Sequence, residues 1–570
     1  MITVADAVAR RLKDRGLRHF FGQSLPSKLV LALEELGVEQ VAYRTENAGG
    51  AMADGFARVS GTVPVVTAQN GPAATLLVPP LIEAKLVRSP VLAIVQEVPS
   101  KFRGKNAFQE IDHFELFRSS SKAVLRIDEP DRAVETLDRA IDLARGGVPG
   151  PVVLLTPADV LLEEVEAPSA DLRDANDGRA TLDFPADRSV PAPTRISEAV
   201  DVLAHAQRPL VIAGGGVHRS GATAALREFV EEHQIPVATT NMGKGAIDED
   251  SSLSIGVIGN AMAPRSTTHG MDEIIAQSDV ILIVGARMNE NGTDSWKLFP
   301  STAVYIQIDI DSEELGRNYP AIRLMGDVDA TLRQVSAEAR RRDSFQADYD
   351  AGVLVQRIAE VKDAAQVTLA AAVDLDQMPI RPERIVRDLA AAVPDDAILV
   401  ADASYSTIWL SNYFHAAGGR YDFVEPRGMA GLGWGFPMAI GAKVAHPERE
   451  VVCITGDGGF GHVWQEMETL VRMDRKVVVV LLDNGILGFQ KHAEIAKYRG
   501  TTTATEFASV DHAGIARASG LDAFDVTDPS ELAPAFAKAL EGEASTLIVV
   551  KTDPRAYPPI TAFGDISEDV

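Results

Sequence analysis

The sequence contains a single cysteine, no long apolar run and no excess of positive charge. One thiol, Cys453, cannot form an intramolecular disulfide and is typical of a protein kept in a reducing compartment. No run of about 18 uninterrupted apolar residues is present, so we expect no membrane-spanning helix. The formal net charge of −26 disfavours broad electrostatic binding to nucleic acid or to an anionic membrane. These absences predict a soluble, cytoplasmic protein with neither nucleic acid nor membrane as a partner.

The length and the apolar patterning predict several domains of one class. A chain of 570 residues is too long for one hydrophobic core, because domains average roughly 100–200 residues. Apolar strand-like runs alternate with helical patterns almost throughout, which is typical of parallel α/β layers. A Pro-, Asp- and Ala-rich stretch and a charged helical stretch interrupt this alternation. We therefore expect an α/β protein of three doubly wound parallel-sheet domains, at 1–165, 190–340 and 380–555, followed by a tail at 556–570.

The clearest chemical signal is a glycine-rich turn after a buried strand in the last domain. The run "VVCIT" is continuously apolar, as in a strand covered on both faces, and it leads into Gly456-Asp457-Gly458-Gly459. Open α/β folds bind ligands at the carboxyl ends of their strands. A helical pattern, "HVWQEMETLVRM", follows, so the glycines suit a diphosphate at a helix N-terminus. An aspartate at that position would repel phosphate unless a divalent cation lay between them.

A second strand brings another ligand to the same edge. The run "KVVVVLLDN" ends on Asp483-Asn484, which places an amide oxygen beside the first turn. Asp457, Asn484, a backbone carbonyl, two phosphate oxygens and water would complete the octahedron that Mg²⁺ prefers. The spacing therefore predicts a strand–helix–strand unit that holds a diphosphate through a magnesium ion.

This combination resembles the diphosphate and Mg²⁺ motif of thiamine-diphosphate (ThDP) enzymes, and the resemblance covers nearly the whole chain. It is most similar to the acetolactate synthase, pyruvate oxidase and 2-hydroxyacyl-CoA lyase superfamily. "RPLVIAGGGV" in the central block and "GMAGLGWGFPMAIGAKVA" in the last block are both typical of it. The resemblance implies a pyrimidine-binding domain, a central nucleotide-binding-like domain and a diphosphate-binding domain, in this order.

The resemblance also implies roles for individual residues. Glu46, in "YRTENAGG", matches the glutamate that hydrogen-bonds the aminopyrimidine ring and favours the imino tautomer, which removes the thiazolium C2 proton. Leu432 matches the apolar residue that packs between the two cofactor rings, and Ile486 matches the residue whose carbonyl binds the metal. The implied metal ligands are Asp457, Asn484 and Ile486, and the implied cofactor-binding residues are Tyr405, Ser406, Ala430, Leu432, Gly456, Asp457, Gly458, Gly459, Asn484 and Ile486.

The residues for the substrate carry a weaker pattern. In acetolactate synthases the segment after the metal asparagine is largely apolar, whereas this chain has "GILGFQKHAEIAKY". His492 and Glu494 in that segment are candidates for a proton donor or acceptor, and exposed positions at a helix start remain the alternative. The substrate candidates are Gln23, Gln69, Asn70, Phe108, Gln109, Phe489 and Gln490.

The expected activity is Mg²⁺- and ThDP-dependent cleavage and formation of a C–C bond on a 2-oxo acid or related carbonyl substrate. An acetolactate synthase-like lyase or transferase of this kind acts as a decarboxylase and a carboligase. The resemblance implies a homodimer or homotetramer, and it leaves open whether the central domain holds FAD, ADP or nothing; Gly214-Gly215-Gly216 would permit a nucleotide.

Three alternatives remain open at this point. An acyl-CoA-active enzyme, similar to 2-hydroxyacyl-CoA lyase or oxalyl-CoA decarboxylase, would use Arg103, Lys105 and Arg265 for CoA phosphates. A sulfoacetaldehyde acetyltransferase is suggested by "AQNGPAAT". A catalytically silent regulatory paralogue is the non-enzyme alternative, which retention of Glu46, Asp457 and Asn484 disfavours.

Overall fold

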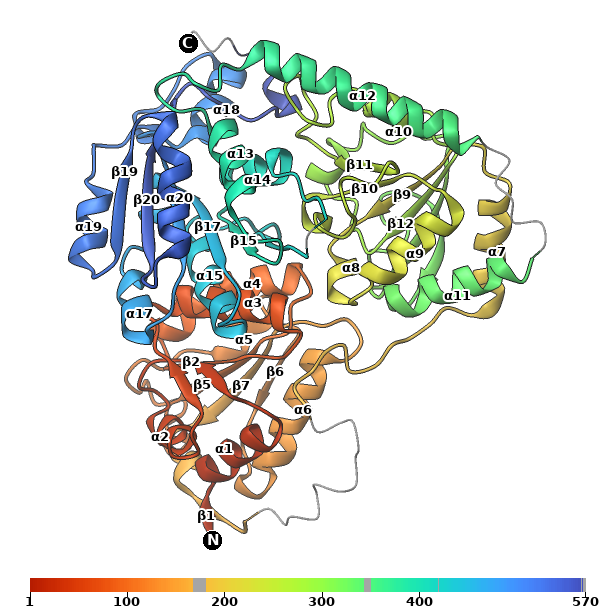
Figure 1. The fold of residues 1–570 in the computed structure, drawn as a ribbon. Helices are drawn as coiled ribbons and strands as arrows, with labels where there is room; N and C mark the ends of the chain where they lie inside the picture. Colours follow the sequence, from red (N-terminus) through yellow and green to blue (C-terminus); the bar gives the residue numbers. More distant parts are fainter. Residues whose placement is uncertain (168–180, 343–349, 419, 565, 567–570) are drawn as a thin grey trace.

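Three six-stranded sheets, one in each third of the chain, organise the molecule (Figure 1). The computed structural model describes residues 1–167, 181–342, 350–418, 420–564 and 566. Every pairing between neighbouring strands of these three sheets is parallel, and helices flank each sheet. The expected fold class, α/β with three parallel-sheet domains, is confirmed.

The first domain has the strand order β3-β2-β4-β5-β7-β6. Its inner strands are apolar runs buried on both faces, as expected when helices cover both sides of a parallel sheet. The strands are β2 (His19–Phe21), β3 (Glu39–Val41), β4 (Val65–Ala68), β5 (Leu92–Glu97), β6 (Ala123–Arg126) and β7 (Val152–Pro157), and the main helices are α1 (Val4–Asp14), α2 (Ser27–Glu35), α3 (Glu46–Ser60), α4 (Pro72–Leu86), α5 (His113–Arg118) and α6 (Ala133–Arg145).

The central domain repeats the architecture with the order β11-β10-β9-β12-β13-β14. Its strands are β9 (Pro209–Ala213), β10 (Val237–Thr239), β11 (Ser254–Val257), β12 (Val280–Val284), β13 (Val304–Asp309) and β14 (Ala321–Met325). Its helices include α7 (Pro193–Ala204), α8 (Gly216–Arg219), α9 (Thr223–His233), α10 (Asp272–Ala276) and α11 (Val328–Arg340). The long helix α12 (Ala351–Ala372) then runs along the edge of this domain toward the third one (Figure 1).

The third domain has the order β16-β15-β17-β18-β20-β19. Because β17 and β18 are neighbours in register, with Gly456 opposite Leu482, their carboxyl ends meet at one edge. The strands are β15 (Ile398–Ala401), β16 (Asp422–Val424), β17 (Val451–Gly456), β18 (Val478–Asp483), β19 (Asp522–Val526) and β20 (Thr546–Lys551), and the helices are α13 (Pro382–Ala392), α14 (Tyr405–Tyr413), α15 (Gly435–Ala445), α16 (Asp457–Phe460), α17 (Glu466–Met473), α18 (Gly488–Tyr498), α19 (His512–Ala518) and α20 (Leu532–Glu541).

The first and third domains share a packed helix pair, α3 against α15. A Cβ added at Gly441 of α15 would lie 1.9 Å from the carbonyl oxygen of Met52, and one added at Gly55 of α3 would lie 2.3 Å from that of Met438. Glycine at these two positions therefore lets the helix backbones touch. One continuous apolar core, which runs from Phe21 to Val549, spans both domains.

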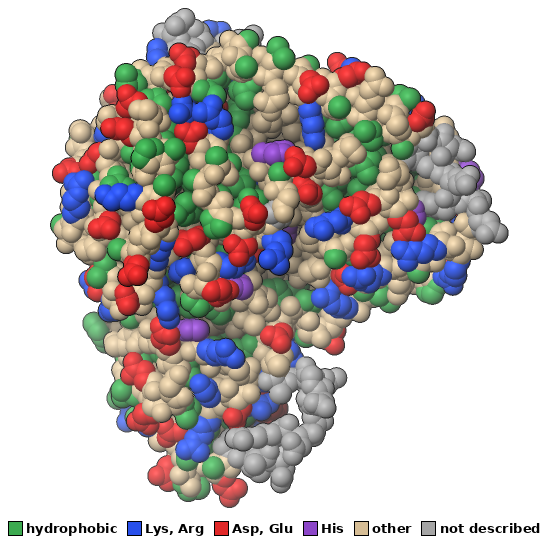
Figure 2. All heavy atoms as spheres, viewed as in Figure 1, with side chains coloured by type: hydrophobic (Ala, Val, Ile, Leu, Met, Phe, Trp, Pro, Cys, Tyr) green, Lys and Arg blue, Asp and Glu red, His purple; other side chains and the backbone are tan. Residues whose placement is uncertain are grey.

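The surface is consistent with the charge pattern of the sequence. On the face drawn in Figure 2, acidic and basic side chains are interspersed, and no broad basic area is visible. Within the described ranges, no helix combines the length and the apolar character that crossing a bilayer requires.

Candidate active site

A cavity opens at the carboxyl edge of the third sheet, and every residue implied for cofactor binding lines it. Two of the substrate candidates, Phe489 and Gln490, lie in its wall as well. The cofactor-binding residues in the wall are Tyr405, Ser406, Ala430, Leu432, Gly456, Asp457, Gly458, Gly459, Asn484 and Ile486. Residues as far apart in the sequence as Tyr405 and Ile486 thus converge because β15, β17 and β18 all end at this edge.

Asp457 joins the turns that follow the two central strands. Its Oδ1 accepts a hydrogen bond from the Gly458 N–H at 2.8 Å, and its Oδ2 accepts one from the Gly485 N–H at 2.7 Å. Burial raises the pKa of Asp457 to about 6, against the opposing effect of these amides. The side chain of Asn484 lies on the second turn, where its Oδ1 accepts from the Ile486 N–H at 3.1 Å.

The helix after the glycine turn is shorter than its sequence pattern predicts. The structure has a four-residue helix, α16, then a series of turns, and α17 begins only at Glu466. These turns bury Phe460 and Val463, which are 1% and 2% exposed, in the core shared with the first domain. Packing of these two side chains against the core accompanies the break between α16 and α17.

The floor of the cavity is bare backbone. A Cβ added at Gly459 would lie 1.9 Å from Asp402 Oδ2, and one added at Gly458 would lie 3.0 Å from the Leu487 side chain. Position 459 therefore has no room for a side chain, and one at position 458 would require Leu487 to move.

Asp402 is a cavity residue that the sequence reasoning missed. It is 1% exposed and accepts hydrogen bonds from the N–H groups of Gly433 and Gly435, both at 3.0 Å. Burial raises the pKa of this carboxyl, while the two amides oppose the rise. Asp402 directly follows strand β15, as Asp457 directly follows β17. The rule that ligands bind at the carboxyl ends of parallel strands could therefore have located Asp402 from the sequence as well.

Two cavity residues adopt backbone conformations that favour glycine. Ser404 has φ 69° and ψ −134°, and Ala430 has φ 62°. Conformations of this kind cost of order 1–3 kcal/mol each and cluster at ligand sites, where the surrounding structure enforces them. The loop that carries Ala430 also presents Leu432, an apolar side chain that is 38% exposed at the cavity wall.

An aromatic group forms another wall of the cavity. The hydroxyl of Tyr405 lies 2.8 Å from Nδ1 of His492, and the two rings stack at 5.8 Å between centroids. The ring of Phe489 meets Tyr405 edge-on at 6.0 Å. Burial raises the pKa of Tyr405 well above its ordinary value. Tyr405 lines the cavity, and His492 contacts it from outside that lining.

Glu494 lies apart from the cavity wall. Its carboxylate accepts hydrogen bonds from the Thr502 N–H at 2.7 Å and from Gln490 Nε2 at 2.9 Å. Because Gln490 is itself a cavity residue, Glu494 touches the cavity through that side chain.

Four of the five first-domain substrate candidates lie together, and all five lie away from this cavity. Gln69 Nε2 donates to Gln109 Oε1 at 2.8 Å, and Asn70 Nδ2 donates to the Gln109 carbonyl at 3.1 Å. Phe108 is 85% exposed beside them. Gln23 belongs to a different part of the domain and donates to the Arg44 carbonyl at 3.1 Å.

Glu46 is the first residue of α3 and is partly exposed. Thr45 caps the helix by accepting a hydrogen bond from the Ala48 N–H, which fixes the place where the helix begins. Glu46 is absent from the lining of the cavity formed by its own chain.

No cluster of three or more His, Cys, Asp or Glu side chains suited to a metal occurs in the part of the chain that the structure describes. A cation at Asp457 therefore has to draw on amide, carbonyl and phosphate oxygens for its remaining ligands. That donor set is oxygen-only, which suits Mg²⁺.

Comparison with known proteins identifies the family. Residues 2–116 match the N-terminal TPP binding domain of thiamine pyrophosphate enzymes, residues 196–335 match the central domain, and residues 402–550 match the C-terminal TPP binding domain. The chain is also 32% identical to a probable acetolactate synthase large subunit of Methanocaldococcus jannaschii, over 98% of this chain and 93% of the relative. This chain belongs to the thiamine pyrophosphate enzymes.

Other relatives agree with this assignment. An acetolactate synthase of Arthrospira platensis is 30% identical over 100% of this chain and 97% of its own length. The acetolactate synthase isozyme 2 large subunit of Escherichia coli is 29% identical over 96% of this chain and 95% of its own length. The resemblance stated from the motifs is thus confirmed, and so is a ThDP-dependent enzyme of the lyase or transferase type.

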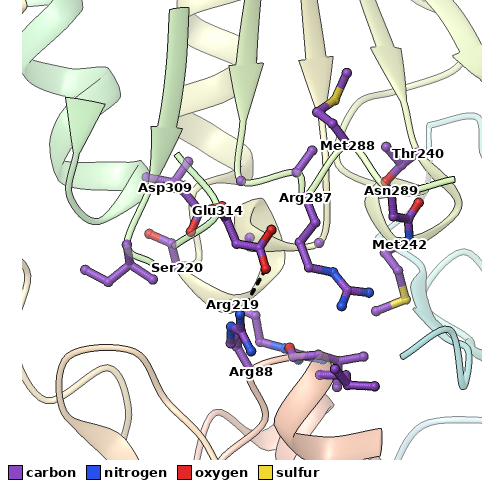
Figure 3. Close-up of a pocket in the computed structure, with 18 of the residues that line it drawn as sticks. Arg88, Arg219, Ser220, Thr240, Met242, Arg287, Met288, Asn289, Asp309 and Glu314 are labelled. Carbon is purple, nitrogen blue, oxygen red and sulfur yellow. Dashed lines mark hydrogen bonds and ion pairs between the residues drawn. The ribbon is translucent and has the colours of Figure 1, made fainter. Parts of the chain in front are cut away.

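This thiamine pyrophosphate enzyme has a second cavity, at the carboxyl edge of its central sheet (Figure 3). Gly216, which follows β9, approaches Gly285, which follows β12, so closely that a Cβ on Gly216 would lie 2.6 Å from the Gly285 Cα. Asp309, at the end of β13, lines the same cavity, and burial raises its pKa to about 6. The glycine approach and the strand-end acid are features of nucleotide sites in doubly wound sheets.

Arginines and acidic side chains both line the central cavity, four of each. Arg88 reaches in from the first domain and pairs with Glu314 at 3.2 Å, while Arg219 and Arg287 come from the central domain (Figure 3). Burial lowers the pKa of Arg219 to about 10. Arg427 lines both this cavity and the one at the third sheet, so the two cavities adjoin. The three cations considered for CoA, Arg103, Lys105 and Arg265, line neither cavity.

Proposed function

We propose that this chain is an acetolactate synthase-like enzyme that cleaves and forms a C–C bond on a 2-oxo acid. The single observation that carries the proposal is the convergence of Asp457, Asn484, the bare glycine floor and Leu432 in one cavity at the edge of the third sheet. The relatives, which are named acetolactate synthases over nearly their full length, support the same reaction class.

The cavity residues fit ThDP and Mg²⁺. Asp457, the amide oxygen of Asn484 and the carbonyl of Ile486 would hold the metal, and the amides of the Gly456–Gly459 turn would face the diphosphate. When bound, ThDP supplies the nucleophilic carbon that attacks the substrate carbonyl. Leu432 would pack against the rings and keep water away from that carbon.

Glu46 would reach a cavity only in an assembly. Since it does not line the cavity of its own chain, we propose a homodimer, or a homotetramer built from two such dimers, in which a second copy supplies it. The cluster of Gln69, Asn70, Phe108 and Gln109 would arrive with the same domain, and the exposure of Phe108 at 85% supports such an interface.

Complementation between two inactive variants tests this arrangement. Glu46→Gln leaves its own cavity intact, and Asp457→Ala leaves its own Glu46 intact. If sites form between chains, a heterodimer of the two variants contains one complete site and recovers activity. If each site is instead built within one chain, the heterodimer contains no complete site. The mixture then shows only the background activity of the two variant homodimers.

For the polar residues near the aromatic wall we propose indirect roles. His492 would act through Tyr405, whose hydroxyl it contacts at 2.8 Å and whose ring lines the cavity. Glu494 would fix the orientation of Gln490, to which it is hydrogen-bonded. Phe489 and Gln490 would then face the substrate, together with the first-domain cluster and Gln23 of the partner chain.

We further propose that the central cavity holds a nucleotide, FAD or ADP. Close glycine approach, half-buried Asp309 and four arginines support a phosphate-bearing ligand with a ribose. The visible absorption spectrum of the purified protein distinguishes a flavin from ADP, and chromatography of the heat-released ligand identifies either. A cytoplasmic location, which the lone cysteine supports, is tested by cell fractionation.

A substrate panel tests the reaction. The purified chain is incubated with pyruvate, other 2-oxo acids and 2-hydroxyacyl-CoA, with and without Mg²⁺ and ThDP, and the covalent cofactor adduct is identified by mass spectrometry. Turnover of a 2-oxo acid is expected, whereas activity only on the CoA ester would favour the lyase. No turnover and no ThDP binding by calorimetry would mean a silent paralogue.

Removal of the metal ligand tests the cavity itself. Asp457→Ala should abolish Mg²⁺-dependent ThDP binding in calorimetry, because the carboxylate is the one anionic ligand among the three. Asp525→Ala is the matched control: it removes an exposed carboxylate on β19 that pairs with Arg517 at 3.2 Å. Wild-type affinity in Asp457→Ala would contradict the metal assignment.

A further inference from the structure

A buried carboxylate of the third domain holds the backbone just before Glu46. Glu466, on α17, is 0% exposed and accepts hydrogen bonds from the N–H groups of Arg44 and Thr45, both at 3.1 Å. Its Oε2 also accepts from the Thr469 hydroxyl at 2.9 Å. Glu466 thus reaches across the domain boundary to the segment that starts α3.

A buried carboxylate of the first domain makes the reciprocal contact. Glu83, on α4, is 0% exposed and accepts from the N–H groups of Gly428 at 2.8 Å, Met429 and Ala430 at 3.3 Å. Arg58 pairs with Glu83 at 3.1 Å and holds it in place. This loop of the third domain leads directly to Leu432.

Asp402 holds the other side of the same loop. It takes the amides of Gly433 and Gly435, so acceptors flank Leu432 on both sides. Charged acceptors form stronger and more directional hydrogen bonds to amides than neutral ones do, and a buried amide that loses its acceptor costs about 1–3 kcal/mol. Glu83 and Glu466 lie outside the cavity lining, so direct contact with the cofactor does not explain them.

We propose that Glu466 and Glu83 are positioning residues, each of which crosses the boundary between the first and third domains and fixes the backbone segment that presents Glu46 and Leu432, respectively. The proposal rests on the proposed function for the roles of Glu46 and Leu432. It assigns to neither carboxylate any contact with substrate or cofactor.

A change of carboxylate to carboxamide should disturb these contacts selectively. Both oxygens of Glu466 accept hydrogen bonds, so Glu466→Gln turns an NH₂ group toward one of the donors. The volume hardly changes, and the cavity residues are untouched. The start of α3 should therefore shift while the diphosphate site stays intact.

The first experiment measures exchange of the ThDP C2 proton by NMR beside ThDP affinity by calorimetry. Glu466→Gln should slow the exchange about tenfold, with affinity within about twofold of wild type. Combined with Glu46→Gln, it should slow the exchange no further, because it acts through Glu46. Exchange at the wild-type rate in Glu466→Gln, or a double variant slowed by the product of the two single effects, would overturn the assignment.

Asp279→Asn provides the matched control. Asp279 also holds two consecutive backbone amides, those of Gln207 at 2.7 Å and Arg208 at 2.8 Å, but it does so within the central domain. Its replacement should leave C2 exchange unchanged. An equal slowing in this variant would mean that exchange responds to any lost amide acceptor, which contradicts a specific positioning role.

Hydrogen–deuterium exchange read by mass spectrometry tests the two contacts without cofactor. The amides of residues 44 and 45 and of residues 428–430 should be protected in the wild type, and each segment should lose protection only in the variant of its own carboxylate, Glu466→Gln or Glu83→Gln. Unprotected segments in the folded wild type would overturn the proposal even if both variants failed to fold. If the wild type did not bind ThDP, the proposed function would be overturned. Protection of the two segments in that same protein would still support the contacts made by Glu466 and Glu83.

Discussion

Glu425 provides a stability prediction because its carboxyl group is buried where the three domains meet. It is 1% exposed, follows β16 of the third domain, and its carbonyl accepts a hydrogen bond from Arg58 of the first domain at 2.5 Å. Burial raises the pKa of Glu425 to about 7, against the lowering effects of Ser411 and of the positive charges of Arg427 and Lys244. Among the described residues, its Oε2 has no hydrogen-bond partner.

The contacts of Ser411 agree with a protonated Glu425. Ser411 Oγ lies 2.7 Å from Glu425 Oε1 and 2.8 Å from the Thr407 carbonyl oxygen. A hydroxyl has one hydrogen to donate, and if Ser411 gives it to the Thr407 carbonyl, its lone pair accepts the proton of Glu425. Both contacts are then satisfied by a neutral carboxyl.

The magnitude follows from the two pKa values. The pKa of the carboxyl is 4.5 when it is exposed and about 7 in the fold. A difference of one between two pKa values corresponds to about 1.36 kcal/mol, so this difference of about 2.5 corresponds to about 3 kcal/mol of unfolding free energy. The folded state binds more protons between these values, so its stability falls as the pH rises from 4.5 and stays low above 7. Glu425→Gln keeps the group neutral at every pH and removes this loss.

Urea unfolding at pH 5 and pH 8 measures the effect. We expect Glu425→Gln and the wild type to have similar unfolding free energies at pH 5, and the variant to be more stable at pH 8 by up to about 3 kcal/mol. Glu541→Gln, on the exposed end of α20, should change nothing at either pH. A variant that is less stable than the wild type at pH 8 would refute the reasoning, because it would show that the fold needs the charge.

Two further substitutions test the geometry of the cavity. Gly459→Ala places a Cβ 1.9 Å from Asp402 Oδ2, so the affinity for ThDP measured by calorimetry should fall at least about tenfold. Gly500→Ala, whose Cβ meets nothing within 4 Å, should bind ThDP normally, and unchanged affinity in Gly459→Ala would show that the floor of the cavity is adaptable. Ser404→Gly should raise the unfolding free energy by about 1 kcal/mol, because φ 69° with ψ −134° strains a serine; a loss of stability in urea would mean that the hydroxyl matters more than the strain.

The cavity at the third sheet was predictable because its signals are local. Each motif follows a continuous apolar run, and parallel strands buried on both faces end at a common edge. Asp457 and Asn484 therefore had to approach one another once "VVCIT" and "KVVVVLL" were assigned to neighbouring strands. Asp402 follows strand β15 in the same way and obeys the same rule.

The amide contacts across the domain boundary were not predictable in this way. Glu83 binds amides 345 to 347 positions away, and Glu466 binds amides 421 and 422 positions away. Every residue except proline carries an amide, so the acceptor has no sequence-specific partner that could mark the pair. The positive φ values of Ser404 and Ala430 are hidden for a related reason, since nothing but tertiary packing enforces them on residues other than glycine.

The path from Asp457 to Glu466 gives these contacts a further meaning. One short stretch of chain, α16 and the turns before α17, connects Asp457, the proposed metal ligand, to Glu466, whose carboxylate holds the start of α3. In the proposed dimer, Asp457 serves the cavity of its own chain while Glu46 serves the cavity of the partner. A cation bound by Asp457 would therefore lie at one end of a segment whose other end, Glu466, holds the backbone before the Glu46 that serves the neighbouring site. In the proposed dimer, the backbone between the glycine turn and Glu466 would therefore join the two sites without any contact between the cofactors.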